Sequence, residues 1–342
     1  MKIILDAMGG DNAPEAVVLG ALDAAKDFNT EIILVGRGED ILAAMEKNGI
    51  RDLPAGVAVA NADDVVDMHD DPAAVLHKRK NSSMVVGLKM LAEGQGDAFV
   101  SAGSTGALLT AATLVVKRVK GIRRAAMAPA FPNKAGGKTI ICDCGANAEC
   151  TPEFLLQFAI VGSLHAKKSL GMKNPRVGLL NIGTEDSKGT ALQLATYPLL
   201  LDAHEKGLIN FIGNVEARQV PLGEVDVVVC DGFSGNVLLK SIEGTAMFLG
   251  STISKMFKKN LFGMLAAALV MKDIKAFKKL LDYREIGGTP FLGIRKPVIK
   301  AHGSSDALAF RNAIHQAMNT PDISKELEEG LAKLSNKENT DD

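Results

Sequence analysis

Six short loops in this sequence combine glycine with hydroxyl, amide or charged side chains, the residue types that hold an oxyanion. The fullest is Ser101–Gly106, which follows the apolar run Ala98–Val100 and precedes a helical pattern from Ala107. The first N–H groups of a helix carry partial positive charge and therefore favour phosphate. This stretch indicates a phosphate site, although one such loop alone is also typical of any strand-to-helix turn.

The other five loops repeat the design, each after a short apolar run. They are Asp6–Asn12, Cys142–Asn147, Asn181–Glu185, Asp231–Asn236 and His302–Asp306. In a parallel sheet, such loops leave the carboxyl ends of the strands, where open α/β folds bind their ligands. We therefore expect the six loops to converge on one crevice.

Few charged residues are expected in that crevice. They are Asp143, Glu185, Asp231, Lys240 and His302. With the surrounding hydroxyls and amides, they suit oxyanion binding and stabilisation of a developing charge better than covalent catalysis. Structural roles are the alternative: the asparagines at 147, 181 and 236 can cap loops, and Lys240 can pair with Glu243.

Three standard catalytic signatures are excluded. The dinucleotide signature Gly-x-Gly-x-x-Gly does not occur. Gly136–Thr139 ends like a Walker loop, but Pro132 stands where the first glycine belongs. The Gly-x-Ser-x-Gly signature of serine hydrolases is matched by neither Gly103–Gly106 nor Gly232–Gly235.

Apolar runs alternate with helical patterns along the chain, which predicts an α/β fold with a mostly parallel sheet and right-handed crossovers. Further strands are expected at 2–5, 31–35 and 57–59. Helices are expected at 14–26, 39–48, 107–119, 151–170, 192–206 and from 244 onward, and 72–93 has helical periodicity around a polar stretch at 77–83. The 342 residues suit one large catalytic domain over 1–334, or two intertwined subdomains, with 335–342 a disordered tail.

The composition restricts the setting of the protein. A net charge of −1 does not indicate nucleic acid as a partner. The chain reaches Asp6 within a few residues of Met1, which predicts no secretory signal and a cytoplasmic, reduced location for the four cysteines. Their spacing matches no standard zinc pattern, so no metal is expected.

One segment departs from the α/β pattern. Residues 251–281 contain an uncharged core at 261–271 with lysines on both sides. The core is too short to span a bilayer, which needs about 20 residues. It suits an interface with anionic lipid, and we predict that the residues entering it are Leu261, Phe262, Leu265 and Leu269. A buried helical hairpin or a subunit contact is the alternative.

Taken in order, the motifs resemble those of the bacterial phosphate acyltransferase family over about residues 1–320. The motifs that carry the resemblance are Asp6–Asp11, Lys80–Met84, Ser101–Ala107, Asp143–Asn147, Asn181–Gly183, Gly213–Glu216, Cys230–Asn236 and His302–Ser305. Ser104 and Cys144 depart from the asparagine and valine that are frequent in the family.

The resemblance implies an enzyme that makes acyl phosphate from acyl-acyl-carrier protein and inorganic phosphate, at the entry to phospholipid synthesis. It implies a three-layer, isopropylmalate-dehydrogenase-like fold, from which we expect a helical protrusion around 251–281. It also implies a homodimer with its site near the subunit interface, and peripheral membrane association. No cofactor is expected.

Acyl transfer to phosphate requires orientation and charge neutralisation more than a strong acid or base, because phosphate is a competent nucleophile and a thiolate leaves easily. The predicted ligands of phosphate and substrate are Ser101, Gly103, Ser104, Thr105, Gly106, Asn147, Asn181, Ser304 and Ser305. The predicted catalytic set is Lys240, His302, Asp231 and Asn236, of which Lys240 or His302 stabilises the oxyanion or the departing thiolate.

The expected partners are the acyl carrier protein, phosphate, a second copy of the chain, an anionic membrane and a downstream membrane acyltransferase. An acidic carrier is expected to dock on basic side chains, namely Lys78, Arg79, Lys80, Arg123 and Arg124. Two alternatives remain open. One is a coenzyme A-dependent phosphate acetyltransferase of the same fold, and the other is a non-catalytic scaffold that binds the carrier at the membrane.

Overall fold

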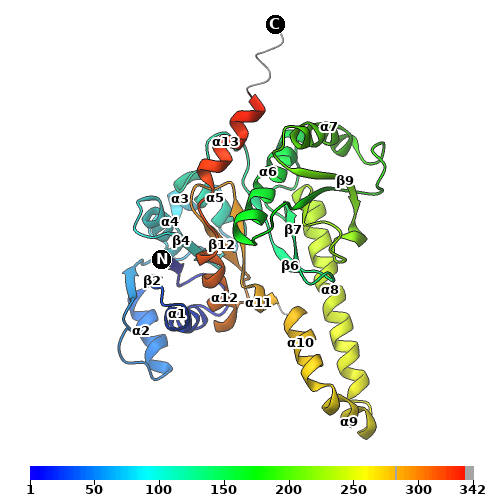
Figure 1. The fold of residues 1–342 in the computed structure, drawn as a ribbon. Helices are drawn as coiled ribbons and strands as arrows, with labels where there is room; N and C mark the ends of the chain where they lie inside the picture. Colours follow the sequence, from blue (N-terminus) through cyan, green and yellow to red (C-terminus); the bar gives the residue numbers. More distant parts are fainter. Residues whose placement is uncertain (282, 336–342) are drawn as a thin grey trace.

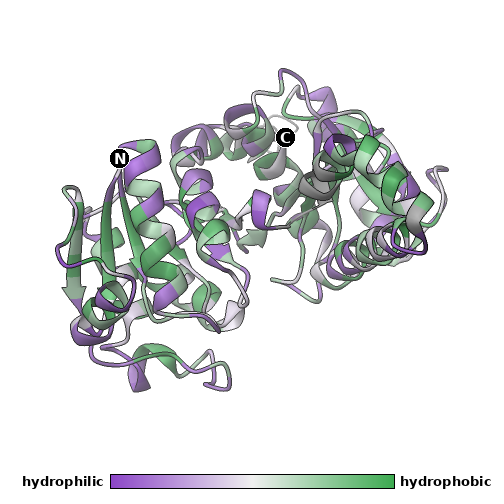
Figure 2. Cartoon of the chain, turned by 90° about the horizontal axis from the view of Figure 1, so that it is seen from below, coloured by the Kyte–Doolittle hydropathy of each residue, from purple (hydrophilic) through white to green (hydrophobic). Residues whose placement is uncertain are grey.

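The computed structural model describes residues 1–281 and 283–335, without the side chains of residues 261, 275, 278–281, 283 and 335. Within these residues the chain forms two mostly parallel sheets with helices on their faces (Figure 1). Both faces of the central strands are buried, and Figure 2 shows them as mostly apolar. This is the pattern that parallel sheets require.

The first sheet contains seven strands in the described part of the chain. In spatial order they are β3 (Val57–Asn61), β2 (Glu31–Gly36), β1 (Lys2–Asp6), β4 (Ala98–Ser101), β12 (Val298–Ala301), β11 (Gly288–Leu292) and β5 (Ala126–Met127). The pairs from β3 to β12 are parallel, and β11 is antiparallel to both of its neighbours. The C-terminal β12 therefore lies directly beside β4, which brings the loop after residue 301 next to the loop after residue 101.

The helices of the first sheet form two outer layers. Ile3 and Leu5 of β1 pack toward α1 (Glu15–Phe28), α2 (Gly38–Lys47) and α12 (Ala307–Met318). The intervening Ile4 packs toward α4 (Ser83–Ala92) and α5 (Thr105–Val115). This alternation gives the three-layer α/β architecture that was predicted.

The second sheet contains five strands among the described residues. Their order is β6 (Ala130–Pro132), β7 (Lys138–Cys142), β10 (Val227–Val229), β8 (Arg176–Asn181) and β9 (Asn210–Glu216), and only β6 is antiparallel to its neighbour. One face is covered by α6 (Pro152–Ser169) and α7 (Ala191–Glu205), with α13 (Ser324–Ser335) against α6. Leu292 of β11 joins this core, so the two halves share apolar contacts.

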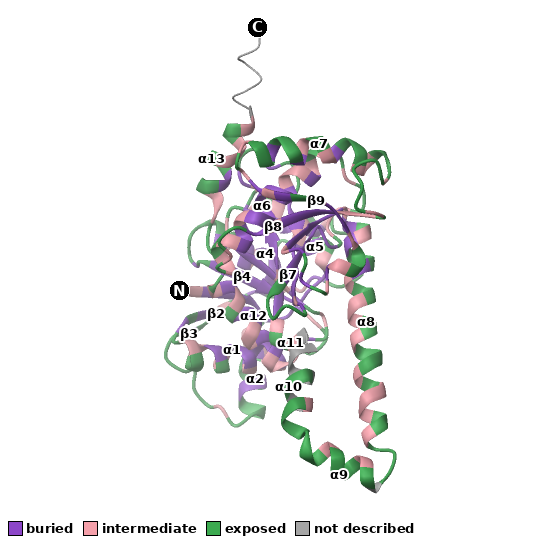
Figure 3. Ribbon diagram, turned by 45° about the vertical axis from the view of Figure 1, so that its right-hand side comes forward, coloured by how far each residue is buried: buried purple, intermediate pink, exposed green. Residues whose placement is uncertain are grey.

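A helical hairpin leaves the second half of the molecule (Figures 1 and 3). Its long arm is α8 (Gly232–Phe257), followed by α9 (Leu261–Leu269), α10 (Met271–Leu281) and the short α11 (Tyr283–Ile286). The predicted protrusion around 251–281 is therefore confirmed. Of the helices in the described residues, none is both long and apolar enough to cross a membrane.

Two predicted helices are wrong in extent. The helix expected from 244 begins at Gly232, because Asp231 caps its first turn by accepting the backbone N–H of Ser234 at 2.8 Å. The segment 72–93 is not one helix: α3 (Val75–Lys78) stops at the polar stretch, and Ser82 then caps α4. Most of the predicted tail at 335–342 lies outside the described residues.

Candidate active site

The loops after β1, β4 and β12, three of the six that were expected to converge, meet at one edge of the first sheet. The N–H of Asp11 donates to the carbonyl oxygen of Gly303 at 2.8 Å. The side-chain amide of Asn12 donates to the carbonyl oxygens of Ser304 and Ser305, each at 3.2 Å. A Cβ added at Gly10 would lie 2.9 Å from Cβ of Ala102, so only glycine allows this approach.

A buried carboxylate organises the loop that follows β4. Asp6 accepts hydrogen bonds from the hydroxyls of Ser83 at 2.5 Å and Ser101 at 2.7 Å. Burial raises the pKa of Asp6, while these hydrogen bonds oppose the rise. The Ser101 hydroxyl also accepts the N–H of Gly103 at 3.0 Å. The Ser101 hydroxyl therefore stabilises the conformation of the loop through hydrogen bonds within the chain, instead of binding a ligand.

The N-terminus of α5 leaves backbone donors for an anion. Its first intrahelical bond runs from the N–H of Leu108 to the carbonyl oxygen of Ser104. Ser104 occupies the N-cap position without a side-chain cap bond, so the N–H groups of Thr105, Gly106 and Ala107 have no partner within the helix. Pro72 lies against this turn, since a Cβ at Gly106 would be 3.0 Å from Pro72 Cγ.

Lys300 is the site residue that the sequence analysis missed. It pairs in register with Ser101 across β12 and β4, and its Nζ donates to the carbonyl oxygens of Ala102, at 3.2 Å, and Ala301. Burial lowers its pKa to about 8, against the opposing effect of Asp6 and Asp11. The sequence feature that could have identified it is the position of a lysine inside the otherwise apolar run Val298–Ala301.

The second half of the molecule holds its own buried carboxylate, Asp143 after β7. It accepts the backbone N–H groups of Met127 at 2.8 Å, Cys144 at 2.7 Å and Asn147 at 2.6 Å. Burial raises the pKa of Asp143 against these bonds. The Asn147 side-chain amide donates to Asp143 at 3.0 Å and to Ala125 O at 2.8 Å. Both of its N–H bonds therefore brace the loop.

The loop after β10 packs against the loop after β7 and is hydrogen-bonded to it. The N–H of Gly232 donates to the carbonyl oxygen of Asn147 at 2.7 Å. A Cβ at Gly235 would clash with the carbonyl oxygen of Asp143, so the first turn of α8 needs glycine there. Asn236 consequently lies beside Gly145, with Oδ1 3.8 Å from the Cβ position of that glycine.

His302 of the first half and Lys240 of the second half lie close enough for their charges to interact. Partial burial lowers the pKa of His302, and the positive charges of Lys240 and Lys300 lower it further. His302 Nδ1 is 2.8 Å from Ser304 Oγ. Lys240 is half exposed and pairs with Glu243 at 2.7 Å, as the structural alternative predicted. The predicted basic groups are thus close together, with Lys300 as a third member.

Two predicted ligands have other surroundings. Asn181 accepts the N–H of Ile182 at 2.8 Å and donates to Lys188 O at 3.0 Å, so its side chain holds its own loop. Ser305 is buried, and its hydroxyl has no hydrogen-bond partner among the described residues.

Of the predicted carrier-docking residues, Arg79 is bound by carboxylates of its own chain, whereas Arg123 and Arg124 are not, within the described residues. Arg79 is held by Asp70 at 2.8 Å and Asp64 at 3.1 Å, so it braces the loop between β3 and α4. Arg124 lies over the ring of Phe154, 5.8 Å from its centroid, and Arg123 lines a surface crevice between α6 and α13.

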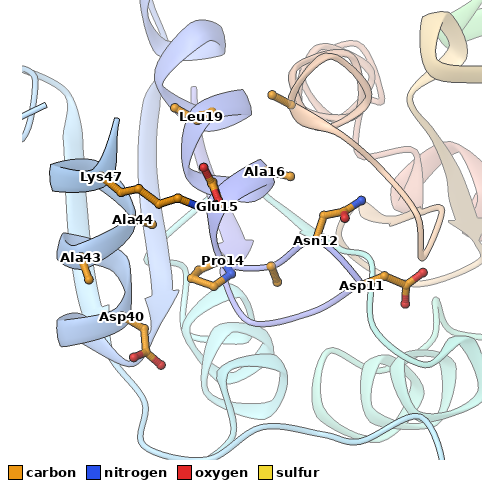
Figure 4. Close-up of a pocket in the computed structure, with 12 residues that line it drawn as sticks. Asp11, Asn12, Pro14, Glu15, Ala16, Leu19, Asp40, Ala43, Ala44 and Lys47 are labelled. Carbon is orange, nitrogen blue, oxygen red and sulfur yellow. Dashed lines mark hydrogen bonds and ion pairs between the residues drawn. The ribbon is translucent and has the colours of Figure 1, made fainter. Parts of the chain in front are cut away.

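A pocket of about 680 Å³ opens beside the converging loops, between α1 and α2 (Figure 4). Asp11 and Asn12 of the β1 loop are among its lining residues, as are Glu15 and Lys47, which form an ion pair at 2.6 Å. Among the described residues, no group of three or more His, Cys, Asp or Glu side chains is arranged to hold a metal ion.

Comparisons with solved structures agree with this architecture. A phosphotransacetylase from Streptococcus pyogenes superposes with a TM-score of 0.62 at 19% identity, over 93% of this chain and 94% of the other. A putative 4-hydroxythreonine-4-phosphate dehydrogenase from Salmonella typhimurium gives 0.56 at 13% identity, over 94% and 99%. At these identities the likeness concerns the fold, and it confirms the predicted fold class.

Sequence relatives are much closer. A phosphate acyltransferase from Alkaliphilus oremlandii is 45% identical over 99% of both chains. One from Brevibacillus brevis is 45% identical over 97% of this chain and 98% of its own. Residues 1–323 also match the family described as fatty acid synthesis protein. The chain belongs to this family and is a phosphate acyltransferase, as the motifs predicted.

Proposed function

We propose that the protein transfers a long acyl group from acyl-acyl-carrier protein to inorganic phosphate, and so supplies acyl phosphate to phospholipid synthesis. The observation that carries the proposal is the N-terminus of α5. Its N–H groups at Thr105, Gly106 and Ala107 lack intrahelical partners, and α5 follows the β4 loop, which lies beside Lys300 of β12 and the loop that bears His302. Such a place binds a phosphate dianion through backbone donors and cations.

The chemistry follows from a bound phosphate. A phosphate oxygen attacks the thioester carbonyl carbon, and a tetrahedral oxyanion forms. The C–S bond then breaks, and the carrier leaves as a thiolate, whose pKa of about 8.5 makes it a good leaving group. Lys240 or His302 stabilises the oxyanion or the thiolate. Asp231 caps the facing turn of α8, and Asn236 lies on that turn beside Gly145.

An acyl-enzyme on a cysteine is disfavoured by the environment of the four thiols. Burial and nearby Asp143 raise the pKa of Cys144 and of Cys150 to about 12. Burial raises the pKa of Cys142 and Cys230 well above the ordinary value. Because the thiolate is the nucleophilic form, these side chains are inert at neutral pH. Direct attack by phosphate needs none of them.

The carrier docks on the basic side chains that remain available for a partner. These are Lys78, Lys80, Arg123 and Arg124, whereas Arg79 is used within the chain. Charge attraction across such a surface mainly increases the association rate.

The protein also binds the membrane peripherally, in this proposal, through the tip of the hairpin. Phe262, Leu265 and Leu269 are 82%, 58% and 88% exposed. Figure 3 shows most of α9 as exposed. The side chain of Leu261 lies outside the described residues. Apolar side chains between lysines suit the interface of an anionic bilayer. Exposed apolar residues nearer the body, such as Phe233 and Val237, are where we place the contact with a second copy.

One assay tests the proposed function against both alternatives. The purified protein is mixed with phosphate and with a long-chain carrier thioester, a long-chain coenzyme A thioester or acetyl coenzyme A, and acyl phosphate is trapped with hydroxylamine. The hydroxamate and thiol formed in the same mixture without phosphate, by direct attack of hydroxylamine on the thioester, are subtracted. We expect acyl hydroxamate and free thiol in equal amounts from the carrier thioester. A preference for acetyl coenzyme A would contradict the long-chain carrier donor, and no product from any donor would indicate a scaffold.

A further inference from the structure

The surroundings of Lys300 need an explanation that the fold does not supply. Lys300 stands in a buried strand, between Ile299 and Ala301, which are fully buried. Its Nζ contacts two neutral carbonyl oxygens, those of Ala102 and Ala301. Within the described part of the chain, no carboxylate lies at ion-pair distance from it. An ammonium that is largely removed from water and has no carboxylate at ion-pair distance is costly to keep charged, so such groups are retained where an anion completes them.

The direction of the side chain identifies where that anion would be. Lys300 pairs with Ser101, and its Nζ contacts the carbonyl oxygen of Ala102 at the start of the loop between β4 and α5. An ammonium has three N–H bonds, and two are directed at carbonyl oxygens. The third has no partner among the described residues, and Lys300 stands opposite Ser101, where the loop to α5 leaves β4. Lys240, by contrast, already has the carboxylate of Glu243 as its partner.

We infer that Lys300 binds the phosphate nucleophile directly through Nζ, opposite the N-terminal N–H groups of α5. This assignment rests on the proposed acyl transfer to phosphate and adds a catalytic residue to it. The two carbonyl contacts fix the ammonium before phosphate arrives. The cation then neutralises charge on the attacking dianion as it approaches the thioester carbonyl.

The charged groups around Lys300 give this role a pH signature. Asp6 of β1 and Asp11 act to raise its pKa, yet burial prevails and lowers it to about 8. The neighbouring groups on other packed elements are His302, Lys240 and Glu243, and Asp306 at the start of α12, which pairs with Arg284 at 3.0 Å. The free enzyme therefore loses this cation as the pH rises through about 8, whereas an arginine would keep it.

The test compares Lys300→Met and Lys300→Arg with Lys296→Met, a matched control in the loop that leads into β12. In Lys300→Met we expect kcat/KM for phosphate to fall by about tenfold to a hundredfold, with the KM for the acyl donor nearly unchanged. Direct phosphate binding, measured by titration calorimetry without donor, should weaken in parallel. Lys296→Met should match the parent protein.

The pH profile separates binding from a structural role. In the parent, kcat/KM for phosphate should decline above about pH 8, by about tenfold for each pH unit, since this parameter reports the free enzyme. Lys300→Arg should keep part of the activity and lose that decline. A parent profile without the decline, or the same decline in Lys300→Arg, would overturn the assignment, even if Lys300→Met fails to fold.

The outcomes also distinguish this inference from the proposed function. If the parent makes acyl phosphate and Lys300→Met does so with unchanged kcat/KM for phosphate, the role of Lys300 is refuted and the reaction stands. If the parent makes no acyl phosphate, but its phosphate binding depends on Lys300, the reaction is refuted and the phosphate site stands.

Discussion

The hydroxyl of Ser101 donates a hydrogen bond of 2.7 Å to the buried carboxylate of Asp6, and this bond joins the end of β4 to the end of β1. The same hydroxyl accepts the N–H of Gly103, so one side chain sets the course of the backbone toward α5. The geometry of the proposed phosphate site therefore depends on a carboxylate that a ligand never touches.

Removing the Ser101 hydroxyl should raise the KM for phosphate more than removing the Ser83 hydroxyl, which also binds Asp6. Ser101→Ala and Ser83→Ala each delete one bond to Asp6, and each should cost about 1–3 kcal/mol of unfolding free energy because the carboxylate is buried. Only Ser101→Ala also releases Gly103, so it should raise the KM for phosphate several-fold more. Chemical denaturation and initial rates measure both effects. Equal KM values in the two variants would contradict the role given to Ser101.

Thr105→Val tests the first turn of α5. The substitution keeps the shape of the side chain but removes its hydroxyl, and we expect phosphate binding to weaken by about 1–3 kcal/mol. Thr110→Val, on the same helix and away from its N-terminus, is the control and should leave the KM for phosphate unchanged. A Thr105→Val protein with unaltered KM for phosphate and unaltered turnover would show that this hydroxyl does not contact the ligand.

Charge reversal tests the carrier-docking surface. Arg123→Glu with Arg124→Glu, and separately Lys78→Glu with Lys80→Glu, should raise the KM for the carrier thioester without changing that for phosphate. Arg79 is left intact, since its ion pairs to Asp64 and Asp70 hold the loop. Carrier affinity should also weaken as salt increases. If both doubly reversed proteins bind the carrier like the parent, neither cluster is the docking site.

Glutamates at the hairpin tip test the membrane contact. Phe262→Glu with Leu265→Glu should abolish co-sedimentation with anionic vesicles, while the protein remains a folded dimer that is active in a soluble assay. Leu42→Glu, at an exposed apolar residue of α2, is the control and should not affect vesicle binding. Each lysine near the surface adds about 1 kcal/mol, so salt should weaken binding. Loss of the dimer in the tip variant would mean that the tip is a subunit contact.

His165 of α6 gives a prediction about acid stability. Burial lowers its pKa to about 4 in the folded protein, below the ordinary value of 6.5, so the unfolded chain takes up the proton more readily. The contribution of neutral His165 to the free energy of unfolding is fully present above pH 6.5. It is lost between pH 6.5 and 4, which lowers the free energy of unfolding by about 3 kcal/mol. Unfolding curves of His165→Gln should show a smaller loss over this range, and those of the exposed His69→Gln should follow the parent. Parallel curves for parent and His165→Gln would contradict the prediction.

The sequence predicted the converging loops because strand-like runs and glycine-rich turns are local features. It could not predict that β12, from the far end of the chain, lies beside β4, and Lys300 acquires its neighbours from that pairing. The start of α8 was missed because Gly232 and Gly235 read as loop residues, whereas close contact with the β7 loop requires them inside a helix. Similarly, Arg79 reads as part of a basic patch until Asp64 and Asp70 are brought to it by the fold.

The most direct measurement of the central claim is a crystal structure of the protein soaked with inorganic phosphate. We predict one phosphate at the N-terminus of α5, with its oxygens within hydrogen-bond distance of the N–H groups of Thr105 and Gly106 and of Lys300 Nζ. Phosphate bound elsewhere, or an empty α5 N-terminus at concentrations that saturate the enzyme in solution, would contradict the account.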